Sequence, residues 1–195
     1  LHNNAGKSHV LIGAAVRHGV EAFVFSSTCA VYGLPQTEQL AETHRIAPIN
    51  PYASSKASVE RALAAAAWRG LRAASLRYFN AAGADASAMI GEAHDPETHL
   101  IPLAIDAVLG LRPCLIIHGS DYATEDGSCV RDYVHVSDLA DAHLRAVRWL
   151  LTQSSRTGRH DAFNLGSGVG YSVKQVVDSV GRLAGQQVPH VFGAR

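Results

Sequence analysis

The sequence has no excess charge of either sign and no long apolar run. Its 195 residues contain 17 Lys plus Arg and 17 Asp plus Glu, so no broad basic field is available to attract nucleic acid or anionic lipid. The longest apolar runs, such as Ala62–Trp68, are far shorter than the roughly 20 residues that a membrane-spanning helix needs. We expect a soluble protein with a small polar ligand and with no nucleic-acid or membrane partner.

Cysteine is scarce. Cys29, Cys114 and Cys129 are odd in number and far apart in the chain, which does not fit a disulfide framework or a zinc knuckle. This usage is typical of a protein of the reducing cytoplasm, which is the location we predict.

Histidine is frequent, with 11 residues, but it is dispersed. Only His94 and His99 fall in one loop, beside Asp95 and Glu97. Since a metal centre needs a compact set of ligands, the sequence predicts no metal site.

The first part of the chain alternates helical and strand patterns. Apolar spacing predicts a helix over Asn4–Gly19, and Ala22–Phe25 is a short strand without polar alternation, as in a parallel sheet that is covered on both faces. Asn50 and Pro51 predict the start of a helix that reaches Trp68, and a strand over Ala73–Tyr78 follows. This order predicts an α/β fold with a partial doubly wound, Rossmann-like parallel sheet.

A loop-like stretch over residues 81–102 predicts a change of lobe. We therefore expect residues 1–81 to form half of the Rossmann-like domain and residues 82–195 a smaller α/β lobe, with residues 131–151 returning to the first sheet. The elements predicted beyond the loop are helix 103–109, strand 115–118, strand 133–136, a helix capped by Ser137 that reaches Leu151, strand 162–165, and a last helix with a Ser172–Gln175 capping box and Gly185 at its end.

Two glycine motifs resemble phosphate-binding loops without completing them. Gly6-Lys7-Ser8 lacks the glycine five positions earlier, where Leu1 stands. Gly166–Gly170 follows a predicted strand, but Tyr171 occupies the position of the third glycine of a dinucleotide-binding fingerprint. A tight turn is the favoured interpretation of Gly166–Gly170, and phosphate binding is the alternative.

Tyr52 and Lys56 are the strongest candidates for chemistry. They stand four residues apart at the start of a predicted helix, so both side chains emerge from one face. The ammonium group and the positive end of the helix both favour the phenolate, which can take a proton from an alcohol. Thr28 ends a predicted parallel strand, where its hydroxyl can hold a substrate oxygen. By spacing alone, an exposed Tyr and Lys on a surface helix is the simpler alternative.

The strand-end hydroxyl followed by Tyr-x-x-x-Lys resembles the extended short-chain dehydrogenase/reductase family of NAD-dependent epimerases and dehydratases, most closely its UDP-glucose 4-epimerase branch. The matching segments begin at Asn3-Asn4 and continue with Phe25–Gly33, Asn50–Lys56, Leu76–Asn80, Val130–Leu139 and Phe163–Gly168.

The resemblance implies that residues 1–81 are the second half of an NAD-binding Rossmann domain and that residues 82–195 are a UDP-sugar-binding lobe. It also implies a role for individual positions. Tyr52 is implied as the catalytic base, Lys56 as the group that tunes it and holds the nicotinamide ribose, and Thr28 as the hydrogen-bonding partner of the reacting sugar hydroxyl. Asn3 and Phe79 match further NAD-contacting positions. The positions that match UDP-sugar contacts, besides Thr28 and Tyr52, are Asn80, His99, Leu100, Ile116, Ile117, His118 and Arg131.

The residue type of Arg131 also suits a contact with the substrate independently of the resemblance, because a guanidinium can bind a diphosphate through paired hydrogen bonds. A structural ion pair with Asp132 is the alternative for this residue.

The reaction that the resemblance implies is inversion at C4 of a UDP-hexose, in galactose metabolism. Tyr52 removes the C4 hydroxyl proton while hydride passes to NAD, and hydride then returns to the opposite face of a transient 4-keto sugar. The dehydratases of the family place an Asp-Glu pair after the threonine, and Cys29-Ala30 stands there instead. Thr28 itself replaces the serine of many epimerases and keeps the hydroxyl.

Three alternatives to this predicted function stay open. His99 stands where many relatives have asparagine, so epimerisation of UDP-N-acetylglucosamine or of a UDP-pentose is one alternative. A non-catalytic nucleotide-sugar-binding module and an inactive truncated fragment are the others.

The family's glycine-rich turn is expected upstream of Leu1, and positions of its uridine site beyond Arg195. We therefore expect this chain by itself to bind NAD weakly and to turn over little. The alanine-rich helices predicted over residues 4–19 and 51–68 suggest burial on more than one side. This burial, together with the resemblance, predicts a homodimer of the full-length form.

Overall fold

The computed structural model describes residues 2–153 and 158–195 as two compact units. The first unit consists of residues 1–79 and 137–166, and the second of residues 80–136 and 167–195. The roles expected for residues 1–81 and 82–195 in cofactor and substrate binding stay predictions.

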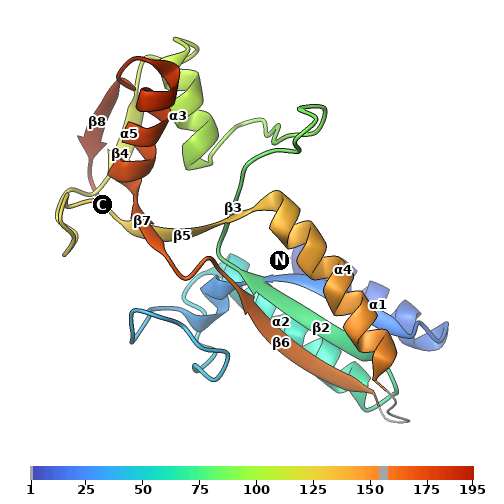
Figure 1. The fold of residues 1–195 in the computed structure, drawn as a ribbon. Coiled ribbons are helices and arrows are strands. Elements are labelled where there is room, and N and C mark those ends of the chain that lie inside the picture. The colour runs from blue at the N-terminus through green and yellow to red at the C-terminus, as the bar shows by residue number, and fades with distance from the viewer. Residues whose placement is uncertain (1, 154–157) are drawn as a thin grey trace. The chain divides into compact units, whose positions relative to one another are not determined.

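The first unit contains a parallel three-stranded sheet in the order β1-β2-β6 (Figure 1). Its strands are β1 (Ala22–Thr28), β2 (Arg72–Tyr78) and β6 (Arg159–Leu165), and its helices are α1 (Lys7–Arg17), α2 (Pro51–Ala67) and α4 (Val136–Thr152). Short helical turns span His2–Gly6 and Cys29–Tyr32. In register, Thr28 lies beside Tyr78 and Tyr78 beside Leu165, so the carboxyl ends of the three strands share one edge.

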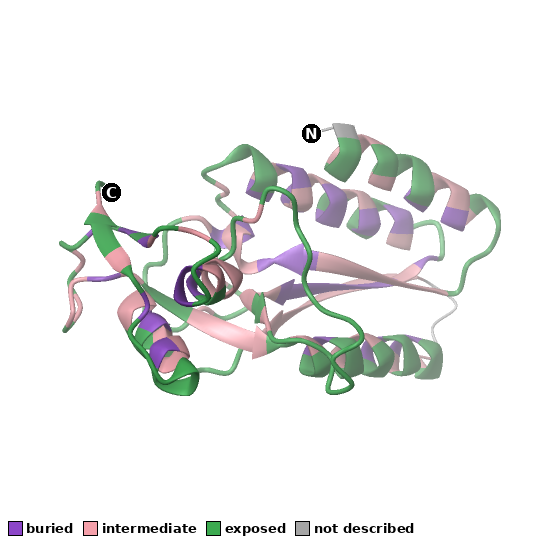
Figure 2. Ribbon diagram, turned by 90° about the horizontal axis from the view of Figure 1, so that it is seen from above, coloured by how far each residue is buried: buried purple, intermediate pink, exposed green. Residues whose placement is uncertain are grey.

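Helices cover both faces of this sheet, as Figure 2 shows. Ala73 packs with Ile12 of α1 and Leu63 of α2, whereas its neighbour Ala74 packs with Ala146 and Leu150 of α4. Successive residues of a strand point to opposite faces, which explains why β2 is apolar on both sides. The α/β class and the parallel sheet predicted from the sequence are confirmed.

The second unit has two small sheets and two helices. In one sheet β5 (Val130–His135) pairs parallel with β3 (Asn80–Ala82) and antiparallel with β7 (Gly170–Ser172), and in the other β4 (Leu115–His118) pairs parallel with β8 (His190–Gly193). The helices are α3 (Leu100–Val108) and α5 (Val173–Ala184). Ala104, Leu115, Ile117 and Val177 form the centre of its core.

Local signals in the sequence locate most of these elements. The capping box of Ser172 with Gln175 is present, and Gly185 ends α5 in the left-handed conformation. Ser137 does not cap α4, because that helix already begins at Val136, where β5 passes into it directly. The strands β3, β7 and β8 have only three or four residues, too few for a periodic pattern to predict them. Among the described residues, no helix is both long and apolar enough to cross a membrane.

A buried ion pair lies in the first unit. Arg77 of β2 donates from Nη2 and Nε to the carboxylate of Glu60 of α2, at 2.5 to 3.2 Å, and both side chains are 7% exposed. By contrast, Glu21 pairs with Arg72 while its own side chain is 73% exposed. A buried pair loses far more than an exposed pair when one partner is removed, because the remaining charge stays buried without compensation.

We expect Glu60→Ala to lower the free energy of unfolding of the first unit by about 3–5 kcal/mol, and the matched variant Glu21→Ala by less than about 1 kcal/mol. Both tryptophans, Trp68 and Trp149, belong to this unit, so urea unfolding followed by tryptophan fluorescence measures its stability. Equal losses in the two variants would contradict the assignment.

Candidate active site

The start of α2 directs three functional side chains along one helix face. The Asn50 side chain caps the helix by accepting from the Ala53 amide at 2.8 Å, and Pro51 occupies the first turn. Tyr52, Lys56 and Glu60 follow at intervals of four residues, which aligns them one turn apart. The predicted pairing of Tyr52 with Lys56 on one helix face is therefore confirmed by the bounds of α2.

Thr28 ends β1 beside this helix. Its side chain is largely buried, and its Oγ1 accepts a hydrogen bond from the Ala30 amide at 3.2 Å, which caps the short helical turn that follows. The neighbouring strand β2 ends at Tyr78, in register with Thr28. The carboxyl edge of a parallel sheet is where such folds bind ligands.

The structure brings Tyr52, Lys56 and Thr28 together. Tyr52 is 48% exposed, its phenol interacts with the Thr28 hydroxyl, and Lys56 Nζ lies 5.6 Å from the centre of its ring. A surface tyrosine and lysine that merely share an exposed helix face would not meet a strand-end threonine. The exposed part of the Tyr52 ring leaves room for a ligand at the same edge.

The pKa of Tyr52 differs from the expectation. Burial raises it above the ordinary 10.0, the neighbouring phenol of Tyr78 and the thiol of Cys29 raise it further, and only the hydrogen bond with Thr28 lowers it. The net shift of the Tyr52 pKa is therefore opposite to the lowering expected from Lys56 and the helix end.

Lys56 explains part of this outcome. Its ammonium donates to the Ser26 carbonyl at 2.9 Å and lies 5.0 Å from the centre of the Phe25 ring, closer than to the Tyr52 ring. Burial lowers the pKa of Lys56. One of its three donors is used by Ser26, which leaves the others for a hydroxyl group of a ligand.

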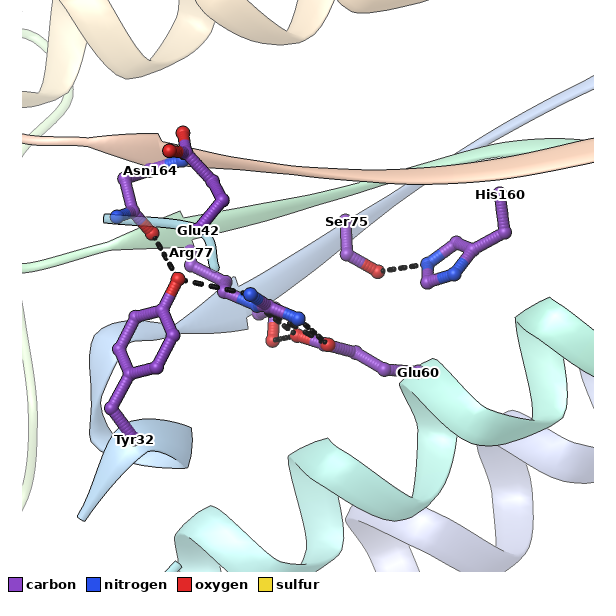
Figure 3. A network of polar contacts seen from close by, with 8 residues as sticks. Tyr32, Glu42, Glu60, Ser75, Arg77, His160 and Asn164 are labelled. Atoms are coloured by element: carbon purple, nitrogen blue, oxygen red, sulfur yellow. Dashed lines mark hydrogen bonds and ion pairs between the residues drawn. The ribbon is translucent and has the colours of Figure 1, made fainter. Parts of the chain in front are cut away.

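A polar network beneath the site was missed by the sequence reasoning (Figure 3). Ser27, next to Thr28, donates to Glu60 Oε1 at 2.5 Å, and Arg77 also donates to the Tyr32 hydroxyl at 2.9 Å. Tyr32 in turn donates to Asn164 of β6 at 2.6 Å. The signal in the sequence was a glutamate one turn after Lys56 and an arginine in the otherwise apolar end of β2.

The protonation states of Arg77 and Tyr32 follow from the contacts of this network. Burial lowers the pKa of Arg77, but hydrogen bonds to Glu60 and Tyr32 outweigh burial and raise it above its usual value. Burial also raises the pKa of Tyr32, against the opposing effect of Arg77. Arg77 therefore stays charged and Tyr32 stays a neutral hydrogen-bond donor.

Asn3 and Phe79, the predicted cofactor contacts, lie near the beginning and at the end of residues 1–79, the first of the two segments that form the first unit. Asn3 is exposed in the helical turn His2–Gly6, and Phe79 is half-buried directly after β2. The Phe79 amide donates to the Leu165 carbonyl at 3.3 Å, which keeps Phe79 at the carboxyl edge of the sheet. Their role in binding NAD stays a prediction.

The remaining predicted substrate contacts belong to the second unit. Asn80 begins β3 and donates to the Asp132 carbonyl at 2.8 Å, and His99 and Leu100 stand at the start of α3. In β4, Ile116 and His118 are exposed, whereas Ile117 is 1% exposed and packs in the core. The side chain of Ile117 therefore cannot line a ligand site, and only its backbone can. The other five residues stay predictions together with Arg131.

Arg131 is exposed on β5 and donates to the Val130 carbonyl at 3.1 Å. The Asp132 carboxylate is held instead by the turn after β6, where it accepts from the amide and hydroxyl of Ser167 and from the Gly168 amide at 2.7 to 3.0 Å. The guanidinium is thus available for a ligand. The anion that the glycine turn binds in this chain is Asp132, which favours the structural interpretation of Gly166–Gly170.

The loop before α3 brings together more potential metal ligands than the sequence predicted. Glu92, which the sequence reasoning did not count, joins His94, Glu97 and His99 so that one ligand atom from each lies within 4.8 Å of the others. The premise that this loop offers no compact ligand set is therefore wrong.

Comparisons with known proteins agree with the geometry. Residues 1–166 match the NAD dependent epimerase/dehydratase family. The chain belongs to this family. The match extends over both strand-end segments and over α2, so the resemblance drawn from the sequence motifs is confirmed.

The family members most similar to the chain include UDP-glucose 4-epimerases. That of Rhizobium leguminosarum bv. trifolii is 54% identical over 96% of the chain and 56% of its own length. The structure of UDP-glucose 4-epimerase from Brucella ovis in complex with NAD has a TM-score of 0.93 at 46% identity and covers all of the chain and 59% of that protein. The enzyme from Stenotrophomonas maltophila, with bound NAD and formylated UDP-arabinopyranose, has a TM-score of 0.92 at 40% identity, over all of the chain and 57% of that protein.

The chain thus spans little more than half the length of these family members. Their Rossmann-type architecture supports the α/β fold class predicted for the first unit. The strand-end threonine and the tyrosine and lysine of α2 all belong to the first unit of the chain.

We expect the phenol of Tyr52 to titrate above pH 10 in the chain without ligands, because burial, Tyr78 and Cys29 all favour its neutral form. Thr28→Val should raise this pKa further, since the Thr28 hydrogen bond is the contact that lowers it. Thr152→Val, at the end of α4, is the matched control and should leave it unchanged. NMR of tyrosines labelled with ¹³C at Cζ, assigned with Tyr52→Phe, measures the midpoint, and tryptophan fluorescence checks that the first unit stays folded. A midpoint below 10 would refute the analysis.

Proposed function

We propose that the protein carrying this sequence inverts C4 of a UDP-hexose, interconverting UDP-glucose and UDP-galactose with NAD as a recycled cofactor. The observation that carries the proposal is the convergence of Tyr52, Lys56 and Thr28 at the carboxyl edge of a parallel sheet. The 54% identity to a UDP-glucose 4-epimerase supports the choice of reaction.

The residues of the first unit fit a nicotinamide cofactor. Lys56 offers unused N–H donors beside Tyr52, as a ribose diol requires, and Phe79 offers an apolar surface at the strand ends. When bound, NAD accepts and returns hydride, and its oxidised ring adds a positive charge that favours the phenolate of Tyr52.

The chain's own side chains position the sugar and move its proton. The Thr28 hydroxyl, held at the strand end by the Ala30 amide, orients the C4 hydroxyl toward Tyr52. Tyr52 takes the proton from that hydroxyl and later returns it to the C4 oxygen of the sugar with the inverted configuration. Cys29 and Ala30 follow Thr28 and supply no carboxylate pair, so these positions favour epimerisation over loss of water.

We propose that the UDP moiety binds to residues of the second unit. Arg131 has the fork geometry that matches a diphosphate, and its guanidinium is exposed on β5. Asn80, His99, Leu100, Ile116 and His118 complete the proposed substrate contacts, with Ile117 contributing its backbone.

A UDP-pentose is the second candidate substrate. The similar UDP-glucose 4-epimerase from Stenotrophomonas maltophila was solved with a derivative of UDP-arabinopyranose, which is a pentose nucleotide. Comparing kcat/KM for UDP-galactose and UDP-arabinopyranose distinguishes the two substrates.

Replacement of Tyr52 by Phe should reduce kcat for UDP-galactose at least about 100-fold, because general acid–base catalysis contributes roughly 10²–10⁴-fold. KM should change little, since the ring remains. Tyr122→Phe is the matched control and should retain the activity, because Tyr122 packs beside Arg195 in the second unit. A coupled assay of UDP-glucose formation gives both constants, and an active Tyr52→Phe variant would eliminate the proposed base.

We also propose that the protein acts as a homodimer in the cytoplasm. Val10 and Leu11 of α1 are 71% and 58% exposed, and an apolar pair on a helix next to the alanine-rich α2 suits a seam between two copies. The three cysteines form no disulfide in the described part of the chain, which supports a reducing compartment.

A charge at this seam should separate the copies. We expect Leu11→Glu to raise the dimer dissociation constant at least about tenfold, because a buried unpaired carboxylate is unfavourable by more than roughly 1.4 kcal/mol. Leu183→Glu changes an exposed leucine of α5, which is 86% exposed, and should leave dimerisation intact. Analytical ultracentrifugation measures both. If Leu11→Glu dimerises as tightly as the unmodified protein, α1 is not the interface.

A further inference from the structure

The segment that leads into α3 contains two copies of the tripeptide Glu-x-His. Glu92-Ala93-His94 and Glu97-Thr98-His99 are separated by Asp95 and Pro96. The chain folds back between them, so that the rings of His94 and His99 lie 4.9 Å apart. Two imidazoles and two carboxylates of the second unit thus meet in one exposed loop.

The four donors converge closely enough to share one cation. His94 Nδ1 lies 3.1 Å from Glu92 Oε1 and 3.8 Å from Glu97 Oε2. His99 Nδ1 lies 2.5 Å from Glu92 Oε1 and 3.0 Å from Glu97 Oε1. Ligands at roughly 2.0–2.2 Å from a tetrahedral ion are about 3.4 Å apart, so the three shorter pairs each have to separate by less than about 1 Å when an ion binds.

The orientation of the groups is the second observation. Both histidines direct the same ring nitrogen, Nδ1, toward the same oxygen of Glu92. Glu97 is also held by the backbone, because its Oε1 accepts from the amides of Thr98 and His99 at 2.7 and 2.8 Å. Hydrogen-bonded support of this kind orients ligands in metal sites.

We propose that Glu92, His94, Glu97 and His99 bind one divalent transition-metal ion of the zinc class. A donor set of two nitrogens and two oxygens matches Zn²⁺ or Co²⁺ better than Ca²⁺ or Mg²⁺, which prefer oxygen alone. The bound ion links Glu92, His94 and Glu97 of the irregular loop to His99, which directly precedes α3. Binding through Nδ1 leaves His99 Nε2 as an N–H donor, which is compatible with its proposed contact to the substrate.

The test uses the full 195-residue chain with its three thiols alkylated, so that cysteine does not contribute. Zn²⁺ is titrated in competition with a chromophoric chelator, and Co²⁺ is used as a visible-absorption probe of four-coordinate geometry. We expect one Zn²⁺ per chain, not displaced by Ca²⁺, and a four-coordinate Co²⁺ spectrum that disappears when Zn²⁺ displaces Co²⁺. The variants His94→Gln and Glu92→Gln each remove one donor. They should weaken Zn²⁺ binding at least about 100-fold, because changes in outer-shell partners alone already cause 10–100-fold losses.

His18→Gln is the matched control, since His18 is an exposed histidine at the end of α1 in the first unit. It should bind Zn²⁺ as the unmodified chain does. Absence of stoichiometric Zn²⁺ binding, equal affinity in His94→Gln and the unmodified chain, or displacement by Ca²⁺ would each overturn the proposal. The result is independent of epimerase activity, so failure here leaves the proposed function untouched.

Discussion

The buried ion pair of Glu60 and Arg77 is the interaction on which the arrangement of the first unit depends. Two charges inside a protein are unfavourable unless their hydrogen bonds are satisfied, and here Ser27, Tyr32 and Asn164 complete the set. These partners come from β1, the turn after it, and β6, while the pair itself joins α2 to β2. A shift of any one element would leave a buried polar group without its partner, so the network defines a single register for all of them.

That register places the candidate catalytic groups. Glu60 lies one turn beyond Lys56 and two turns beyond Tyr52 on α2, and Ser27 directly precedes Thr28 on β1. Locking Glu60 to Ser27 therefore locks the phenol and ammonium of the helix to the hydroxyl of the strand end. An apolar contact between α2 and β1 would be less directional, because hydrophobic packing tolerates small translations that a bidentate hydrogen-bonded pair does not. Reactive groups lose much of their effectiveness when displaced by about 1 Å, which gives the buried charges a rationale beyond stability.

Short-range features of the sequence predicted the fold well, and long-range contacts limited the prediction. Asn50 before Pro51 and the Ser172–Gln175 box act within one turn, so residue identity alone locates those helix ends. The start of α4 depends on where β5 stops pairing, which local sequence does not show. The burial of Ile117 depends on the alternation of buried and exposed residues within a strand of only four residues. The convergence of Tyr52, Lys56 and Thr28 was accessible because parallel strand ends share an edge. Glu92 joined the two histidines only through the path of an irregular loop, which no periodic pattern describes.

The raised pKa of Tyr52 shows why the position of a candidate catalytic base does not determine its protonation state. Helix position and a lysine four residues away argue for a phenolate, yet Lys56 lies closer to Phe25 and donates to the Ser26 carbonyl, and the phenol of Tyr78 lies nearby. Burial acts on the charged form of Tyr52 in the same direction as Tyr78 and Cys29. In the proposed reaction, the positive charge needed to produce the phenolate then arrives with the oxidised cofactor and is lost when hydride is transferred. Under that scheme Tyr52 is a phenolate while the sugar hydroxyl must lose its proton and a neutral phenol when the proton must be returned, so one side chain serves both directions of the reaction.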